Sequence, residues 1–180
     1  FAKAEECYTK ALEIRKRLEK TNPGAFEPDL AASYNNLGNL YRKTNNLAKA
    51  EECYTKALEI YQRLAKINPE AFGPYLAASY NNLGILYSDT NDFAKAEECF
   101  TKALEIRKRL AEVNPESFEP DLAMSYYNFG VLYFESSDYI KATEYYEKAL
   151  ELYERLEART PGQYSENLQE CREMLEKLKE

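Results

Sequence analysis

The sequence predicts an all-α solenoid, a superhelix of stacked helix-turn-helix repeats, and three observations lead to this fold class. The segment FAKAEECYTKALEI at residues 1–14 recurs from residues 47, 93 and, more loosely, 139, with an offset of 46 residues each time. Residues 1–46 and 47–92 are identical at 34 positions, so both halves of the unit are duplicated. Two stretches of each unit have apolar residues at helical spacing. Such a helix pair cannot bury its own apolar face, so neighbouring units must stack and share a core.

The first stretch of each unit is predicted to be a helix, which we call helix A. In the second unit its apolar residues fall on one face of a helix with 3.6 residues per turn. These residues are Leu76, Tyr80, Leu83, Gly84 and Tyr87.

The second stretch, helix B, follows the polar turn SDTND and consists largely of good helix formers. Asp92 and Asp138 are placed to cap its first free amides, and Asn46 can do the same in the first unit. The Asn-Pro pairs that begin at residues 22, 68 and 114 should end it, because the residue before a proline is pushed out of the helical conformation. Its apolar stripe in the second unit is Phe93, Ala96, Cys99, Phe100, Ala103, Leu104, Ile106 and Leu110.

The repeat register divides the chain into a single array of five segments. Residues 1–23 contain a helix B (1–21) without its helix A, so we expect the array to be cut at its N-terminus and the chain, which begins without Met, to be a piece of a longer polypeptide. Three repeats follow, at 24–69, 70–115 and 116–161. In residues 162–180, the part from 164 aligns with helix A without its signature residues, which is typical of a solvating C-terminal capping helix. A narrow apolar stripe remains there at Leu168, Cys171, Leu175 and Leu178.

The apolar and small residues of helices A and B resemble a known repeat signature. The pattern Tyr34-x-x-Leu37-Gly38-x-x-Tyr41, followed by Ala50-x-x-x-Tyr54 and Ala57, looks like the tetratricopeptide repeat, and the next two units repeat it around Gly84 and Gly130. The resemblance implies a right-handed α–α superhelix. A Cβ at the glycines would hold helix A away from helix B, and we expect Ala50, Ala96 and Ala142 to be their small counterparts on helix B.

The unit is twelve residues longer than the usual 34-residue repeat, and in this it is similar to the lengthened repeats of kinesin light chain. We expect the extra residues to extend helix B to residues 47–67, about 30 Å, and to add a loop, EAFGPY at 70–75, before the next helix A. An aromatic residue recurs in this added segment and is expected to cover the end of helix B. These residues are Phe26, Phe72, Phe118 and Tyr164.

Composition argues against several classes of function. The net charge of −7 disfavours nucleic acid as a partner, and no apolar run is long enough for a membrane helix. The chain has no His, which removes the usual catalytic base and the commonest metal ligand. Pairs such as Glu51-Glu52 point about 100° apart on a helix and cannot flank one bond. We therefore predict that the chain is not an enzyme and uses no cofactor.

The four cysteines favour neither a disulfide nor a metal site. Cys7, Cys53 and Cys99 share one repeat position, so a full solenoid step of about 10 Å should separate them, beyond the reach of a disulfide. We expect them to be small buried apolar groups. Thiols that need no pairing fit a reducing compartment, so a cytoplasmic location is expected.

The candidate binding residues lie on helix A. In tetratricopeptide arrays helix A lines the concave surface, so the resemblance implies a groove for a peptide or protein segment. The side-chain amide of Asn can donate to and accept from a peptide backbone at once. The alternative is that these amides bond only neighbouring turns or water. The candidate residues are Asn35, Asn36, Asn39, Asn81, Asn82, Ile85, Tyr127, Asn128, Val131 and Phe134.

The same positions disfavour a C-terminal carboxylate as ligand. Family members that bind such tails use Lys or Arg there, whereas this chain has Ala, Asn, Met or Tyr. The third unit instead brings Tyr127, Val131 and Phe134 toward the groove, which favours a ligand with apolar anchors.

Two other functions remain open from the sequence. The bare helix B at residues 1–21 offers an apolar stripe without a preceding helix, which favours self-association as a dimer. The array can also be the regulatory part of a larger signalling protein. The stripe consists of Ala4, Cys7, Tyr8, Ala11, Ile14 and Leu18.

Overall fold

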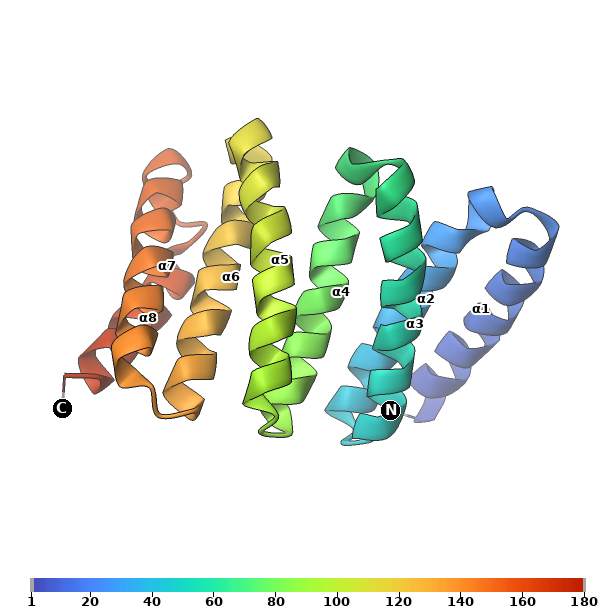
Figure 1. Ribbon diagram of the computed structural model, residues 1–180, viewed down its shortest axis with the longest axis horizontal. Coiled ribbons are helices and arrows are strands. Elements are labelled where there is room, and N and C mark those ends of the chain that lie inside the picture. Colours follow the sequence, from blue (N-terminus) through green and yellow to red (C-terminus); the bar gives the residue numbers. More distant parts are fainter. Residues whose placement is uncertain (1, 180) are drawn as a thin grey trace. The chain divides into compact units, whose positions relative to one another are not determined.

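The computed structural model describes residues 2–179, and this part of the chain contains eight α-helices and no strand (Figure 1). Phe1 and Glu180, which belong to the predicted first and last segments, lie outside the described residues. The predicted all-α repeat fold is thereby confirmed. The helices are α1 (Ala2–Thr21), α2 (Pro23–Lys43), α3 (Leu47–Ile67), α4 (Pro69–Asp89), α5 (Phe93–Val113), α6 (Pro115–Glu135), α7 (Tyr139–Arg159) and α8 (Ser165–Lys177).

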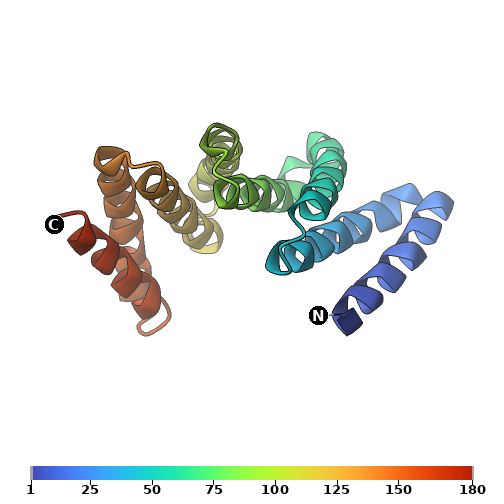
Figure 2. The same cartoon turned by 90° about the horizontal axis from the view of Figure 1, so that it is seen from below.

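The chain folds as two compact units that divide between Leu86 and Tyr87, near the end of α4. From here on, the first unit and the second unit are these two parts of the chain, each of which is longer than one 46-residue repeat. In the first unit, α2 packs between α1 and α3. In the second unit, α6 packs between α5 and α7, and α8 packs on α7. Figure 2 shows the helices of each unit side by side, with consecutive helices running in opposite directions. Helices α2, α4 and α6 are the predicted helices A, and α1, α3, α5 and α7 are helices B.

Helix B has the predicted length, but the expected loop before helix A does not exist between the repeats. Helix α3 covers residues 47–67, whereas EAFGPY at 70–75 forms the first turns of α4. Asn68 separates the two helices alone, and its Oδ1 accepts a hydrogen bond from Ala71 N at 3.1 Å. Pro69 occupies the first helical position, where no amide donor is needed. Pro74 lies in the second turn and is tolerated inside the helix. Proline and glycine in this segment therefore mark a helix start rather than a loop.

The turns within the repeats use left-handed residues. Asn45, Asn91 and Ser137 have φ values of 58°, 59° and 63°, and the amide two residues beyond each helix end closes the turn. Asp92 and Asp138 cap α5 and α7 as predicted, by accepting from Lys95 N at 3.3 Å and Lys141 N at 3.2 Å. The predicted cap by Asn46 is wrong, because its side chain makes no such bond.

In each of the two units, a glycine of helix A faces a tyrosine ring of helix B. A Cβ at Gly38 would lie 2.6 Å from Tyr54 Cε1, and a Cβ at Gly130 would lie 2.6 Å from Tyr146 Cδ1. Both tyrosines are fully buried. The glycines thus face an aromatic ring rather than the alanines that the sequence suggested as their counterparts. Ala50 and Ala142 are nevertheless fully buried.

The ends of the long helices are tied together by charged and aromatic side chains. Glu119 of α6 is buried and accepts from Arg155 Nη2 at 3.0 Å and from Arg159 Nη1 at 2.7 Å, both of α7. Tyr164, one of the recurring aromatic residues, packs on Tyr153 near the end of α7 with ring centroids 6.0 Å apart. These contacts keep the extra turns of the 46-residue unit attached to the core.

Candidate protein-binding surface

The asparagines of α2 divide into two that bond within the first unit and one that does not. Asn35 Nδ2 donates to Ser79 Oγ of α4 at 2.9 Å, and Asn39 Oδ1 accepts from Tyr54 Oη of α3 at 2.6 Å. Asn36 is exposed, and its side chain makes no hydrogen bond within residues 2–179. Asn35 and Asn39 therefore join helices, whereas the amide of Asn36 is available to a ligand.

Helix α4 presents the corresponding residues of the first unit. Asn82 is half-buried and its side chain, like that of Asn36, makes no hydrogen bond in the described part of the chain. Asn81 is buried, and Ile85 is half-buried. The bond from Asn35 to Ser79 holds α2 against α4, and Asn36 and Asn82 occupy the same repeat position on these two helices.

In the second unit, α6 presents aromatic and apolar side chains at these positions. Tyr127, Asn128, Val131 and Phe134 are all half-buried. The Tyr127 ring lies edge-on to the Tyr146 ring, with centroids 5.5 Å apart. Phe134 lies 5.8 Å from the Tyr139 ring, and Tyr139 is itself half exposed. The structure thus brings apolar candidates together on α6.

Two carboxylates of α8 border this part of α6. Tyr127 packs against the cluster that contains Leu168 and Cys171 of α8. Burial, followed by the nearby Glu170, Cys171 and Glu173, raises the pKa of Tyr127. Glu170 and Glu173 were not among the residues predicted from the sequence, although the 46-residue offset aligns them with Met124 and Tyr127.

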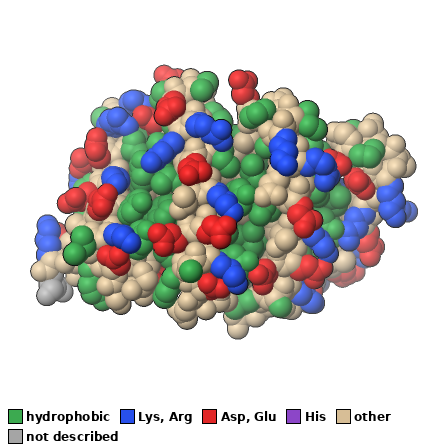
Figure 3. Space-filling model, viewed as in Figure 1, with side chains coloured by type: hydrophobic (Ala, Val, Ile, Leu, Met, Phe, Trp, Pro, Cys, Tyr) green, Lys and Arg blue, Asp and Glu red, His purple; other side chains and the backbone are tan. Residues whose placement is uncertain are grey.

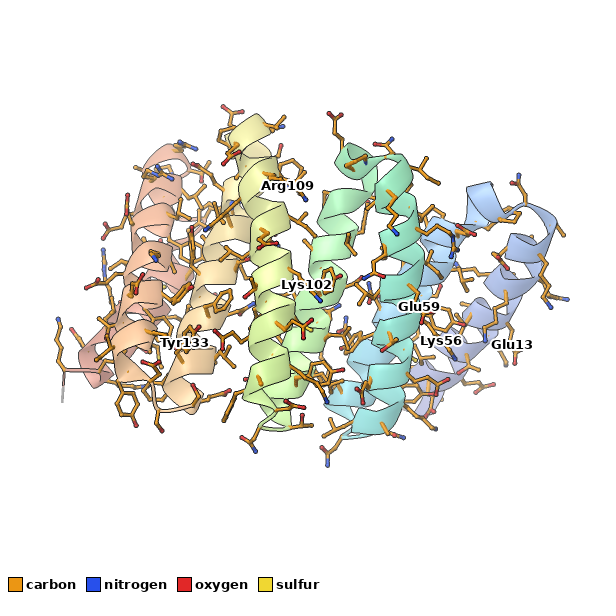
Figure 4. All side chains as sticks on the ribbon, in the orientation of Figure 1. Glu13, Lys56, Glu59, Lys102, Arg109 and Tyr133 are labelled. Carbon is orange, nitrogen blue, oxygen red and sulfur yellow. The ribbon has the colours of Figure 1, made fainter. Side chains whose placement is uncertain are left out.

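Charge is distributed unequally between the two kinds of helix. Neither α4 nor α6 contains a lysine or an arginine. The helices B carry both signs, which Figure 3 shows intermixed over α3 and α5. Figure 4 shows Lys56 and Glu59 along α3, and Lys102 and Arg109 along α5. Many of these charges pair four residues apart, for example Lys102 with Glu98 at 2.5 Å, which is typical of a solvated helix face.

Several lysines of helix B also lie over tyrosine rings of helix A. Lys49 lies 5.0 Å from the Tyr41 ring, Lys95 lies 5.1 Å from the Tyr87 ring, and Lys141 lies 4.7 Å from the Tyr133 ring. These distances allow cation–π attraction. The pairs recur at one repeat position, so they belong to the repeat fold rather than to a ligand site.

Helix α1 has the features of an uncovered helix B. Tyr8, Ile14 and Leu18 are 40%, 49% and 38% exposed, whereas the equivalent Tyr54, Ile60 and Leu64 of α3 are 9% exposed or less. Open depressions of about 580 and 440 Å³ lie along this helix, the larger one beside Ile14. The apolar stripe predicted here is therefore accessible.

The cysteines are free thiols, but they are not all buried as predicted. Cys53, Cys99 and Cys171 are buried, whereas Cys7 is exposed, because no helix of residues 2–179 covers this side of α1. Within residues 2–179 no three His, Cys, Asp or Glu side chains are grouped so that they could hold a metal ion. No helix of this part is long and apolar enough to cross a membrane.

The stacked helix pairs define a repeat scaffold of the class that mediates protein interactions. The chain belongs to the tetratricopeptide repeat family. One family model described as tetratricopeptide repeat matches residues 1–63 and 29–109, and a second with the same description matches residues 122–157. The resemblance to this family that the sequence shows is thus confirmed.

Solved structures show the same fold at low sequence identity. BtubC (BKLC) from P. vanneervenii is 23% identical with a TM-score of 0.55, over 97% of this chain and 81% of its own. The putative kinesin light chain repeats of Podosopora anserina are 19% identical with a TM-score of 0.58, over 96% of this chain and 85% of theirs. RapI is 23% identical with a TM-score of 0.66, over 83% of this chain but only 48% of RapI. A comparison with curated protein sequences found no significant match.

Proposed function

We propose that the helix A surface of each compact unit binds an extended segment of a partner protein and that the asparagines on it hold the main chain of that segment. The observation that carries this proposal is the contrast among the amides of the first unit. Asn35 and Asn39 have partners inside the fold, whereas Asn36 and Asn82 have none within residues 2–179. Asn is a mediocre helix former, so the fold gains nothing from an unbonded Asn in mid-helix. A ligand that bonds to the amide gives these residues a role.

In the second unit, apolar side chains supply most of the proposed interaction. Val131 and Phe134 are partly accessible on α6, and Met124 is 43% exposed. Binding of this kind combines main-chain hydrogen bonds with apolar anchors and gives affinities of about micromolar strength. The proposed role is binding alone.

The test is selection from a displayed library of random dodecapeptides, followed by affinity measurement with fluorescein-labelled copies of the selected peptides. The variant combines Asn36→Ala, Asn82→Ala and Asn128→Ala. We expect about tenfold weaker binding, because two or three hydrogen bonds to the ligand are lost. Asn22→Ala is the matched control, because Asn22 is exposed and its side chain caps no helix. Unchanged affinity in the triple variant, with its helical content intact, would contradict the proposal.

A second function, self-association through α1, is favoured by the exposed stripe of Tyr8, Ile14 and Leu18. Apolar patches of this kind often mark interfaces. Light scattering should show a dimer that Ile14→Glu converts to a monomer. A monomer at high concentration for the unmodified chain would remove this second candidate.

A further inference from the structure

We propose that Tyr127, Glu170 and Glu173 select the ligand and that the selected segment carries a Lys or Arg next to an apolar side chain. This inference rests on the proposed function, because it adds the chemistry of the bound segment to a surface already assigned to binding. It concerns only the second unit, in which α6 and α8 provide the three residues.

The first reason is charge complementarity. Glu170 and Glu173 are exposed and three residues apart, so they lie on one face of α8. Gln169 Nε2 donates to Glu173 Oε1 at 2.9 Å, which leaves the second oxygen of this carboxylate available. Arg172 is turned to Glu154 of α7, at 3.1 Å. Helix α6 has no basic residue, and besides Arg172 the one basic residue within α8 is Lys177 in its last turn.

The second reason is the aromatic and apolar surface beside these carboxylates. Met124 and Tyr127 are three residues apart on α6 and lie on one side of that helix. Lysines of this chain already lie 4.7–5.8 Å from tyrosine rings elsewhere in the fold. A cation of the ligand can make the same contact with Tyr127 while it pairs with Glu170 or Glu173. Its apolar neighbour then packs on Met124.

The third reason is a buried hydrogen-bond donor without an acceptor. Tyr146 is fully buried, and its hydroxyl makes no hydrogen bond within the described residues. The equivalent Tyr54 donates to Asn39, but Val131 stands at the equivalent position on α6. The ring of Tyr146 contacts the ring of Tyr127. A bound segment whose main-chain carbonyl reaches this donor beside the Tyr127 ring satisfies a group that is costly to leave unpaired.

The experiment uses the same displayed library of dodecapeptides, selected separately on the whole chain and on the variant that combines Glu170→Gln with Glu173→Gln. We expect Lys or Arg beside an apolar residue in the peptides selected on the unmodified chain, and loss of the basic preference on the variant. Labelled peptides from the first selection should bind the variant roughly twofold to fivefold more weakly, because an exposed ion pair is lost. Higher salt should reduce this difference. Tyr146→Phe should weaken binding about threefold, because one hydrogen bond to the ligand is lost.

Glu147→Gln with Glu151→Gln on α7 is the matched control, because it removes two exposed charges of the same unit elsewhere. Selected peptides without a basic preference, or an equal loss of affinity in the control, would overturn the ligand chemistry while leaving the proposed function in place. Unchanged binding by the Asn36, Asn82 and Asn128 variant would instead contradict the proposed function. A selection that yields no binding peptide would overturn both.

Discussion

Tyr54 donates a 2.6 Å hydrogen bond to Asn39 across the helix pair of the first unit, and the second unit keeps the tyrosine but not its acceptor. In α7 the equivalent residue is Tyr146, and in α6 Val131 replaces the asparagine. The middle repeat has Ile85 and Phe100 at the two equivalent sequence positions, and neither side chain has a hydrogen-bonding group. The hydroxyl of Tyr146 is therefore buried at a cost that the hydroxyl of Tyr54 does not carry.

The first prediction compares removal of the two hydroxyl groups. Tyr54→Phe should lower the free energy of unfolding by about 1 kcal/mol, because it removes a hydrogen bond. Tyr146→Phe should leave stability unchanged or raise it by up to about 1 kcal/mol, because it removes a desolvated donor. Urea denaturation followed by circular dichroism measures both. Equal losses in the two variants would show that the Tyr146 hydroxyl has an acceptor after all.

The second prediction concerns the glycine that faces the Tyr54 ring. Gly38→Ala should destabilise the protein by up to about 2 kcal/mol, because overpacking costs about 1–3 kcal/mol and the better helix propensity of alanine offsets only about 1 kcal/mol. Gly24→Ala is the control. A Cβ there meets nothing within 4 Å in the first turn of α2, so this variant should be neutral or more stable. Thermal unfolding midpoints distinguish the two. A stabilised Gly38→Ala variant would mean that the Tyr54 ring moves aside freely.

Two features show which parts of the fold the sequence predicts: the glycine at position 38, and the segment before Leu76. The recurrence of Gly38 with the repeat reveals a close approach of helices, because such contacts repeat with the chain. The partner of the glycine was misjudged, since spacing along the chain does not show which side chain of the facing helix fills the gap. The start of α4 was also missed. Gly73 and Pro74 suggest a loop, but Pro69 starts the helix and the partly buried Phe72 holds its first turns on the core.

The candidate site was less accessible to prediction from the sequence. The side chain of Asn35 resembles that of Asn36 in every local respect, yet its partner Ser79 lies on the next helix A and follows only from three-dimensional stacking. Glu170 and Glu173 lie in a helix that has lost the repeat signature. Candidate residues were predicted only in helices that have this signature, so these two were not among them. Only the offset between α6 and α8 places them beside Tyr127.

The third prediction tests the buried carboxylate that joins α6 to the end of α7. Glu119→Gln should lower the free energy of unfolding by about 1–2 kcal/mol, because it weakens charged hydrogen bonds to Arg155 and Arg159, whose side chains remain half exposed. Glu116→Gln, an exposed change in the same helix, should have little effect. Urea titration gives both values. Equal stability of the two variants would mean that solvation of the carboxylate outweighs its two ion pairs.

The fourth prediction uses the difference among the thiols. Cys7 is exposed, whereas burial raises the pKa of Cys99 to about 11 and that of Cys171 to about 12. Because the thiolate is the reactive form, iodoacetamide at pH 8 should modify Cys7 first and the buried thiols more than tenfold more slowly. Peptide mass spectrometry over a time course measures the four rates. Modification of Cys99 as fast as Cys7 would show that α5 separates readily from its neighbours.

The fifth prediction concerns the pH dependence of the loop between α7 and α8. Glu157 accepts hydrogen bonds from Ser165 Oγ at 2.6 Å and from the amides of Gly162 and Tyr164 at 2.7 Å, and these bonds lower its pKa below 4.5. A carboxylate with a lowered pKa in the folded state stabilises the loop above pH 4.5, and this contribution is lost as the pH falls through the folded value.

Amide hydrogen exchange of Gly162 and Tyr164 should therefore accelerate, relative to the intrinsic rate, only below pH 4.5. In Glu157→Gln, the exchange of these two amides should not depend on pH beyond the intrinsic rate, because the glutamine side chain has only one oxygen that can accept. Glu151→Gln, an exposed change on the same helix, should leave it intact. Protection of the two amides that does not vary with pH in the unmodified chain would mean that the backbone of the loop holds its conformation without the carboxylate.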